Sequence, residues 1–253
     1  MDIGARTEQQ DRVLTLRRDD DLLLVLADGM GGHEDGALAA QTVVDVARES
    51  FESSDAVDAE DLLVSIAVAA HARINAAGAE RGVSPHSTCV LLHLTERRAV
   101  WAHVGDSRLY RFHQGRLSGR TTDHSVVELL RLRGRISEEE MKTHTRKNAV
   151  YEALGGEEPP EVEVASQELD RTDGFLLASD GLWENVADHE LEAVFEMSDL
   201  SIALERLVKN ARRRGGEACD NISVLAARRQ RASRSLAARL RRRLRAGHTR
   251  SSD

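Results

Sequence analysis

Cysteine and proline are scarce in this sequence, and long apolar runs are absent. Its 253 residues include two cysteines, Cys89 and Cys219, which lie far apart and form no metal-ligand pair, so neither a disulfide scaffold nor a cysteine zinc site is expected. Three prolines and no Gly/Ser-rich stretch leave no internal linker before residue 228. No basic-then-apolar signal opens the chain, and no apolar run approaches the ~20 residues that span a bilayer. We therefore expect a reduced, cytoplasmic protein.

Positive charge is concentrated at the C-terminal end. Residues 228–253 contain ten arginines and one acidic residue, Asp253, whereas the whole chain has a formal charge of −8. The rest of the chain is therefore strongly acidic. An acidic body without an aromatic and basic stripe argues against nucleic acid in its binding site. We expect a folded domain over residues 1–228 and an arginine-rich tail over residues 229–253.

Short apolar runs predict buried β-strands between helical patterns. The predicted strands are Val13–Leu16, Leu22–Leu26, Val90–Leu94, Ala99–Val104, Phe175–Ala178 and Ile222–Ala226. Apolar residues at helical spacing predict helices over residues 62–74 and 200–211, the second with Asp199 as N-cap. Ser137 before three glutamates indicates a further capped helix start. Because strands and helices do not alternate strictly, we expect an α+β fold with layered antiparallel sheets.

Aspartates stand where the predicted strands begin or end. Asp28, Asp106 and Asp180 follow strands, whereas Asp11 and Asp220 precede them. A single Asp-Gly pair is typical of an ordinary turn, but five such junctions are hard to explain by turns alone. Carboxylates gathered at rigid strand ends repel one another unless cations neutralise them, and all-oxygen sites suit Mg²⁺ or Mn²⁺. The pattern predicts a carboxylate-rich metal site.

Seven short motifs then occur in a recognisable order. They are Arg6-Thr-Glu-Gln-Gln-Asp11, Ala27-Asp28-Gly29-Met30-Gly31-Gly32-His33, Val104-Gly105-Asp106-Ser107-Arg108-Leu-Tyr110, Thr122-Asp123-His124-Ser125, Ala153-Leu-Gly155-Gly156, Ser179-Asp180-Gly181-Leu182-Trp183 and Asp220-Asn221-Ile222-Ser223. Over residues 1–228 the chain resembles the metal-dependent protein phosphatases of type 2C, in their bacterial form. The resemblance implies a β-sandwich of two antiparallel sheets flanked by helix pairs. It also implies a serine/threonine phosphatase that hydrolyses phosphoserine and phosphothreonine with metal-activated water at a binuclear Mg²⁺ or Mn²⁺ centre.

The resemblance also implies metal ligands. Asp28 would bridge two ions, with the Gly29 carbonyl as a further ligand. Asp180 and Asp220 would complete the first ion, and Asp11 would support the second. Asp106, together with Asp180, would hold a third ion.

Two other residues receive roles from the same resemblance. Arg6 would bind the phosphate through a two-pronged contact that suits its planar guanidinium. His33 would either protonate the leaving oxygen or only fix its loop, and both readings stay open. The chain departs from many relatives at Gln10, where a glutamate is common, and at Met30, where animal relatives place a histidine. His124 is expected to brace a turn.

Two rival functions fit the same pattern less well. A pseudophosphatase would keep the fold as a phosphoprotein-binding module, but Asp28, Asp180 and Asp220 are all present. A two-metal nuclease would need a surface for nucleic acid, which the acidic body lacks. Phosphorylated proteins, including serine/threonine kinases and their targets, are the expected partners of a monomer.

Two segments outside these motifs carry further expectations. Residues 125–145 are highly charged and are expected to form a mobile flap beside the site, although a plain surface helical hairpin fits as well. In the tail, Leu236, Leu240 and Leu244 fall on one face of an arginine-rich helix. This pattern predicts contact with an anionic membrane or an acidic partner, with a solvated tail as the alternative.

Overall fold

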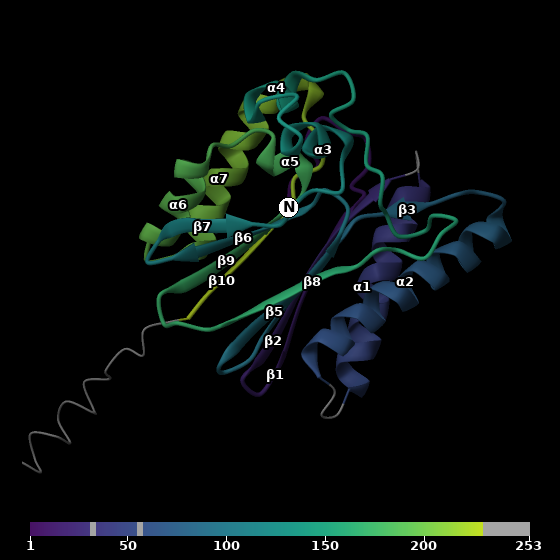
Figure 1. The fold of residues 1–253 in the computed structure, drawn as a ribbon, viewed down its shortest axis with the longest axis horizontal. Coiled ribbons are helices and arrows are strands. Elements are labelled where there is room, and N and C mark those ends of the chain that lie inside the picture. The colour runs from purple at the N-terminus through teal and green to yellow at the C-terminus, as the bar shows by residue number, and fades with distance from the viewer. Residues whose placement is uncertain (31–33, 55–57, 230–253) are drawn as a thin grey trace, which may run out of the picture.

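The computed structural model describes residues 1–30, 34–54 and 58–229, and within these ranges the fold has four layers (Figure 1). One sheet has the order β1 (Asp11–Arg18), β2 (Asp21–Met30), β4 (Cys89–Leu94), β5 (Arg98–Val104) and β8 (Glu163–Glu168), and β3 (His86–Ser87) pairs with the end of β2. The other has the order β10 (Val224–Arg228), β9 (Asp173–Ala178), β6 (Arg108–His113) and β7 (Arg116–Arg120). All named strand pairs are antiparallel.

Helices cover the outer face of each sheet. The first sheet is covered by α1 (Glu34–Ser53) and α2 (Ala59–Arg81). The second is covered by α5 (Asp180–Trp183), α6 (Asp188–Glu196) and α7 (Leu200–Gly215), which leads into the short 3₁₀ helix η1 (Gly216–Ala218). Two short helices, α3 (Val126–Leu132) and α4 (Glu138–Thr143), lie in the connection between β7 and β8. The predicted β-sandwich with flanking helix pairs is confirmed.

Side-chain alternation along β2 explains the layers. Leu23 and Val25 face the core beneath α1 and α2, whereas Leu24 and Leu26 face the second sheet. Successive strand residues point to opposite faces, so a fully apolar strand can serve two cores at once. Each large aliphatic side chain buried this way contributes about 1.5–3 kcal/mol. This dual burial fixes the register of β2, which carries Asp28.

The helix α2 has the length and apolar composition of a membrane span, although no sufficiently long apolar run was expected. In this fold one of its faces packs in the core through residues such as Leu63, Ile66 and Ile74. Such burial is typical of the core helix of a globular domain.

The predicted Asp199 cap of α7 is confirmed, because its Oδ1 accepts hydrogen bonds from Ser201 N and Ile202 N at 2.8 and 3.3 Å.

Some elements differ from the prediction. The last strand begins at Val224 rather than Ile222, because Ile222 pairs with Asp2 in an isolated bridge and Ser223 N donates to Ser179 Oγ. No helix was predicted over α1, whose buried face consists mostly of alanine and valine. The strand β6 and the polar strands β7 and β8 were also missed. The capping box at Ser137 that opens α4 is confirmed.

Candidate active site

A cleft of about 450 Å³ opens where several strand ends meet. The strand β4 lies between β2 and β5 and is antiparallel to both, so β2 and β5 run in the same direction and end at the same edge of the sheet. The strand β1 is antiparallel to β2 and begins at that edge. The cleft is lined by Arg6, Thr7, Glu8, Gln10, Asp28, Gly29, Met30, Asp106, Asn148, Val150, Asp180, Asp220 and Asn221. Segments more than 200 residues apart in the sequence therefore meet at one site.

Asp11 and Asp28 are cross-strand neighbours at this edge. Asp11 opens β1 and lies opposite Asp28 in the antiparallel register. The strand β2 does not end before Asp28, although Asp28 was predicted to follow the strand. It continues through Gly29 and Met30, which pair with β3 instead of β1. A Cβ on Gly29 would lie 1.9 Å from the carbonyl oxygen of Gly36, so glycine is required for the start of α1 to approach this strand.

Asp180 is held at the start of a helix. Ser179 is the N-cap residue of α5, and its Oγ donates to Asp11 Oδ2 at 2.9 Å and accepts from Ser223 N at 2.9 Å. One serine hydroxyl therefore joins β1, β9 and the start of β10 directly behind the cleft. Asp180 follows as the first residue of the helix and lines the cleft.

Asp106 is fixed from the same helix. Trp183, one turn after Asp180, donates from Nε1 to the Asp106 backbone carbonyl at 3.1 Å. The Arg108 guanidinium lies 3.6 Å from the centre of the Trp183 ring and donates to both carboxylate oxygens of Asp123. This packing holds the turn that carries Asp106 against α5.

Arg6 reaches the cleft by pairing with Asp220. Its Nε donates to Asp220 Oδ1 at 2.9 Å and its Nη2 donates to Oδ2 at 2.6 Å, a bidentate geometry. Asn221 secures the neighbouring backbone: its Oδ1 accepts from Gln10 N at 2.7 Å, and its Nδ2 donates to Ile3 O and Glu8 O. The N-terminal loop and the loop before β10 are thus tied together at the site.

Burial and mutual repulsion perturb the carboxylates. Burial raises the pKa of Asp28 well above its ordinary value, with Asp11 and Asp180 adding to the effect. Burial, followed by repulsion from Asp106 and Asp220, does the same for the pKa of Asp180. Burial raises the pKa of Asp106 to about 7 and that of Asp11 to about 6. Each of these carboxylates holds its proton more strongly when its neighbours are ionised, because nearby charges of the same sign disfavour ionisation.

The donor set fits hard divalent cations. Oxygen atoms dominate the cleft, and the described residues of its lining include no cysteine or histidine. Asp11 Oδ1 is buried and has no hydrogen-bond partner among the described residues, so a cation would satisfy it. Carboxylates and backbone carbonyls are the ligands that Mg²⁺ and Mn²⁺ prefer. The cleft can therefore concentrate divalent cations beside an arginine that binds anions.

The structure brings most of the predicted site residues together. Six line the cleft: Arg6, Asp28, Gly29, Asp106, Asp180 and Asp220. Asp11 lies directly behind them, and His33 lies outside the described residues. His124 was predicted to brace a turn, and its backbone N–H does donate to Gly105 O, at 2.9 Å.

Sequence reasoning missed several residues of the cleft. Asn148 and Val150 enter it from the segment after α4, and no pattern in the sequence marks them. Thr7 and Glu8 lie within one of the seven motifs, but they received no role. Asn221 and Ser179 also stand inside these motifs, next to the aspartates they help to position.

The chain is similar to known bacterial phosphatases. The family described as protein phosphatase 2C matches residues 2–222. Protein phosphatase PhpP of Streptococcus pneumoniae is 30% identical over 233 residues, which are 88% of this chain and 93% of that protein. Serine/threonine protein phosphatase PstP of Mycobacterium tuberculosis is 32% identical over 210 residues, which are 81% of this chain but 40% of PstP.

Solved structures agree with these relatives. The crystal structure of Mycobacterium tuberculosis PstP superposes with a TM-score of 0.80 at 31% identity, covering 90% of this chain and 96% of that one. The PstP catalytic domain in complex with two manganese ions gives a TM-score of 0.77 at 31% identity, covering 87% and 91%. With this fold, this cleft and these relatives, the chain belongs to the protein phosphatase 2C family.

Proposed function

We propose that this chain is a protein serine/threonine phosphatase that hydrolyses phosphoserine and phosphothreonine with metal-activated water. One observation carries the proposal: Asp28, Asp106, Asp180 and Asp220 converge on a cleft that also contains an arginine. The described lining of the cleft contains no cysteine, so it supplies no thiolate nucleophile for a covalent phosphoenzyme. Hydrolysis by activated water needs no such nucleophile.

The family resemblance assigns the metal ligands, and the aspartates it names lie together at the cleft. Asp28 and the Gly29 carbonyl, together with Asp180 and Asp220, would hold the first Mn²⁺ or Mg²⁺ ion. Asp11 and Asp28 would support the second, and Asp106 with Asp180 a third. When bound, such ions lower the pKa of water and offset negative charge on the phosphoryl group. The two manganese ions in the structure of the PstP catalytic domain support a centre with two ions.

Arg6 would bind and orient the phosphoryl group. Two of its donor groups contact Asp220, which sets the plane of the guanidinium at the rim of the cleft. A guanidinium has five N–H donors, so three remain for phosphoryl oxygens. The side chain is 55% exposed, so an incoming phosphate can reach it. A lysine has neither the fork nor the fixed plane.

Release of inorganic phosphate from phosphoserine and phosphothreonine peptides tests the proposal. Turnover is expected with Mn²⁺ or Mg²⁺ and should disappear with EDTA. The same assay on a phosphotyrosine peptide separates the proposal from a general phosphatase, and gel electrophoresis of single-stranded DNA after incubation separates it from a nuclease. Metal-dependent cleavage of DNA without phosphopeptide turnover would contradict it.

The arginine-rich tail, residues 229–253, supports a proposal about location. The body carries strong negative charge and the tail strong positive charge, so the tail suits an anionic membrane surface better than the body does. Each arginine near such a surface adds about 1 kcal/mol. We propose that the phosphatase is cytoplasmic, acts on kinase targets and is held at the membrane periphery by its tail.

Vesicle sedimentation tests the role of the tail. The full chain should co-sediment with anionic vesicles at low salt, and a chain truncated after Arg228 should not. Turnover on phosphopeptides should be equal in the two proteins. Truncation that changes turnover while vesicle binding is absent would point to an autoregulatory contact instead.

A further inference from the structure

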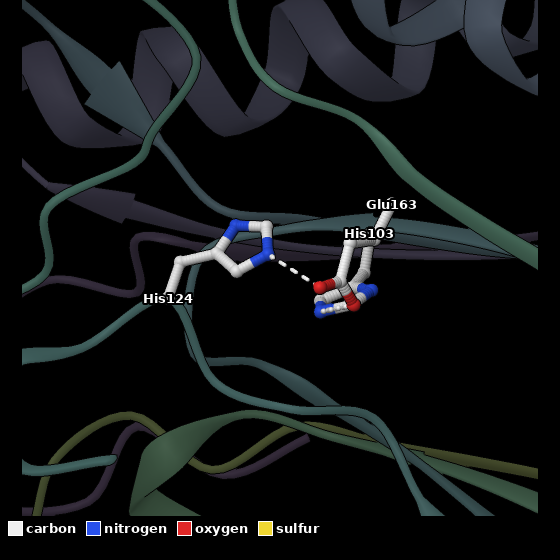
Figure 2. A group of neighbouring side chains, drawn as sticks. All are labelled: His103, His124 and Glu163. Atoms are coloured by element: carbon white, nitrogen blue, oxygen red, sulfur yellow. Dashed lines mark ion pairs between the residues drawn. The ribbon is translucent and has the colours of Figure 1, made fainter. Parts of the chain in front are cut away.

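Two buried histidines and a glutamate form a cluster separate from the cleft (Figure 2). His103 lies on β5, Glu163 opens the neighbouring strand β8, and the register places them directly opposite each other. His124 enters from the loop after β7. One ligand atom from each of the three lies within 4.8 Å of the others. None of the three lines the cleft.

The distances suit a metal ion with only small movements. Glu163 Oε2 lies 3.6 Å from His103 Nε2, and its Oε1 lies 3.8 Å from His124 Nε2. Ligands on a tetrahedral zinc ion lie roughly 3.4 Å apart, given Zn–N and Zn–O bonds of about 2.0–2.2 Å. The Glu163 side chain is 54% exposed, so it can adjust, whereas the two imidazoles are buried and fixed.

The hydrogen bonds of His103 leave one nitrogen unused. Its Nε2 donates to Thr122 O at 2.8 Å, and its Nδ1 is buried without a partner among the described residues. The nitrogen near Glu163 is Nε2, so a metal bound there would replace the bond to Thr122 O and move the ring proton to Nδ1. Nδ1 has no competing partner among the described residues, so it can receive that proton.

The surroundings favour a cation. Burial and the neighbouring His103 lower the pKa of His124, so its imidazole is neutral at neutral pH. Glu152, Glu161 and Glu163 add negative charge around it, which raises the local concentration of cations. Imidazole nitrogens favour Zn²⁺ over Mn²⁺ and Mg²⁺ in the general order of metal affinities.

We propose that His103, His124 and Glu163 form a second metal site, which takes a nitrogen-preferring divalent cation such as Zn²⁺ and lowers turnover when occupied. The link to the cleft is Gly105, the residue before Asp106. Its N–H donates to His124 Nδ1 at 3.3 Å, and its carbonyl accepts from His124 N at 2.9 Å. The site is new, whereas its effect on turnover depends on the proposed phosphatase activity.

The tautomer of His124 explains the link. A ring nitrogen that accepts a hydrogen bond carries a lone pair, so the proton of the neutral ring sits on Nε2 while Nδ1 accepts from Gly105. Metal binding at Nε2 moves that proton to Nδ1, where it faces the Gly105 N–H. Two donors then oppose each other, and the turn that carries Asp106 shifts. Occupancy of the site should therefore disturb the cleft.

Zinc binding by the full chain in the presence of excess Mn²⁺ tests the site. Excess Mn²⁺ competes with Zn²⁺ for the carboxylate cleft, and equilibrium dialysis with metal analysis measures the Zn²⁺ that remains bound. The wild type should bind one more equivalent than Glu163→Gln, whose Zn²⁺ affinity should fall at least about tenfold. Glu161→Gln is the matched control, because it removes the same charge two residues away and should bind like the wild type.

The bound Zn²⁺ is compared between variants, because a second group could also hold a metal ion and would add to the total in every protein. That group is His113, Asp170 and Asp173. His124→Gln is the second variant and should lose the same equivalent. Equal zinc binding by the wild type and Glu163→Gln, or complete displacement of zinc by Mn²⁺, would overturn the site. Either result can be read without an activity assay, so it is distinguishable from a failure of the proposed phosphatase function.

Phosphopeptide turnover at saturating Mn²⁺ tests the link to the cleft. Micromolar Zn²⁺ should inhibit the wild type and Glu161→Gln, and more Mn²⁺ should not reverse the inhibition. Glu163→Gln should keep normal turnover and require at least about tenfold more Zn²⁺ for the same inhibition. Equal inhibition of all three proteins, or zinc bound at this site without inhibition, would overturn the link.

Discussion

Arg6 is the residue proposed to bind the phosphoryl group at the rim of the cleft. Arg6→Ala removes a charge-assisted contact with the phosphoryl group, which is worth about 1.5–3 kcal/mol. We expect a rise mainly in KM, with kcat/KM on phosphopeptides about 10–150-fold lower. Steady-state kinetics with the matched variant Arg17→Ala, an exposed arginine at the far end of β1, controls for the change in net charge.

Arg6→Lys separates shape from charge. Lysine keeps the charge but cannot pair with Asp220 through two parallel bonds, so KM should stay raised. If Arg6→Lys matched the wild type on phosphopeptides, the bidentate role would be wrong.

Asn221 is predicted to matter for stability. Its side chain makes three hydrogen bonds to the backbone of the N-terminal loop, and it is buried. Asn221→Ala removes all three of these hydrogen bonds, so the free energy of unfolding should fall by about 2–4 kcal/mol. Urea denaturation measures this change. Asn210→Ala, at a half-buried position of α7 where the side chain makes an exposed hydrogen bond with Arg213, should change it by less than about 0.5 kcal/mol.

At the scale of elements, residues 125–145 form α3 and α4 beside the segment that brings Asn148 and Val150 into the cleft. The two helices agree with the surface helical hairpin that was the alternative, and a flap that acts on substrate stays a prediction. Replacing residues 125–145 with those of a relative should change the ranking of phosphopeptides. Turnover of p-nitrophenyl phosphate, which has no peptide to recognise, should stay nearly constant. An unchanged peptide ranking would count against this role.

A feature can be predicted from the sequence when the residues that specify it are neighbours in the chain. The strand–aspartate junctions are local, so the sequence alone identifies Asp28, Asp106, Asp180 and Asp220. The strand β8 carries no apolar pattern, because it is a polar edge strand that pairs only with β5 among the described strands. Its pairing brings Glu163 to His103, a contact between residues 60 positions apart that only the register specifies.

The site shows the same limit. The motif Asp220-Asn221 is visible in the sequence, but the bond from Arg6 to Asp220 joins residues 214 positions apart. Ser179 stands next to a predicted ligand, yet its bond to Asp11 depends on the two sheets meeting. Sequence patterns indicate which residue types converge, and packing determines which atoms touch.

At the scale of the whole molecule, clustered carboxylates make stability depend on pH. The folded-state pKa of Asp11 is raised to about 6 and that of Asp106 to about 7. Raised carboxylate pKa values favour the folded state at low pH, and this contribution is lost as the pH rises through those values. The melting temperature of EDTA-treated protein should therefore fall as the pH rises from about 5 to about 8.

Manganese should reverse that loss. A ligand at 100 times its Kd adds about 2.7 kcal/mol, which corresponds to roughly 5–10 °C for a domain of this size. The gain should be larger at pH 8 than at pH 5, because protonated carboxylates bind cations poorly. Calorimetry at the two pH values measures it. A gain that is equal at both would mean that the ion binds elsewhere.

The most direct test of the central claim is phosphopeptide turnover by Asp28→Ala beside Asp21→Ala. The two aspartates occupy the same strand, Asp28 in the cleft and Asp21 at the opposite end. With Mn²⁺ present, Asp28→Ala should lose several orders of magnitude in turnover because it lacks the carboxylate that the metal ions would share, whereas Asp21→Ala should match the wild type. Substantial turnover by Asp28→Ala, with Mn²⁺ or after metal removal, would contradict hydrolysis in this carboxylate cleft.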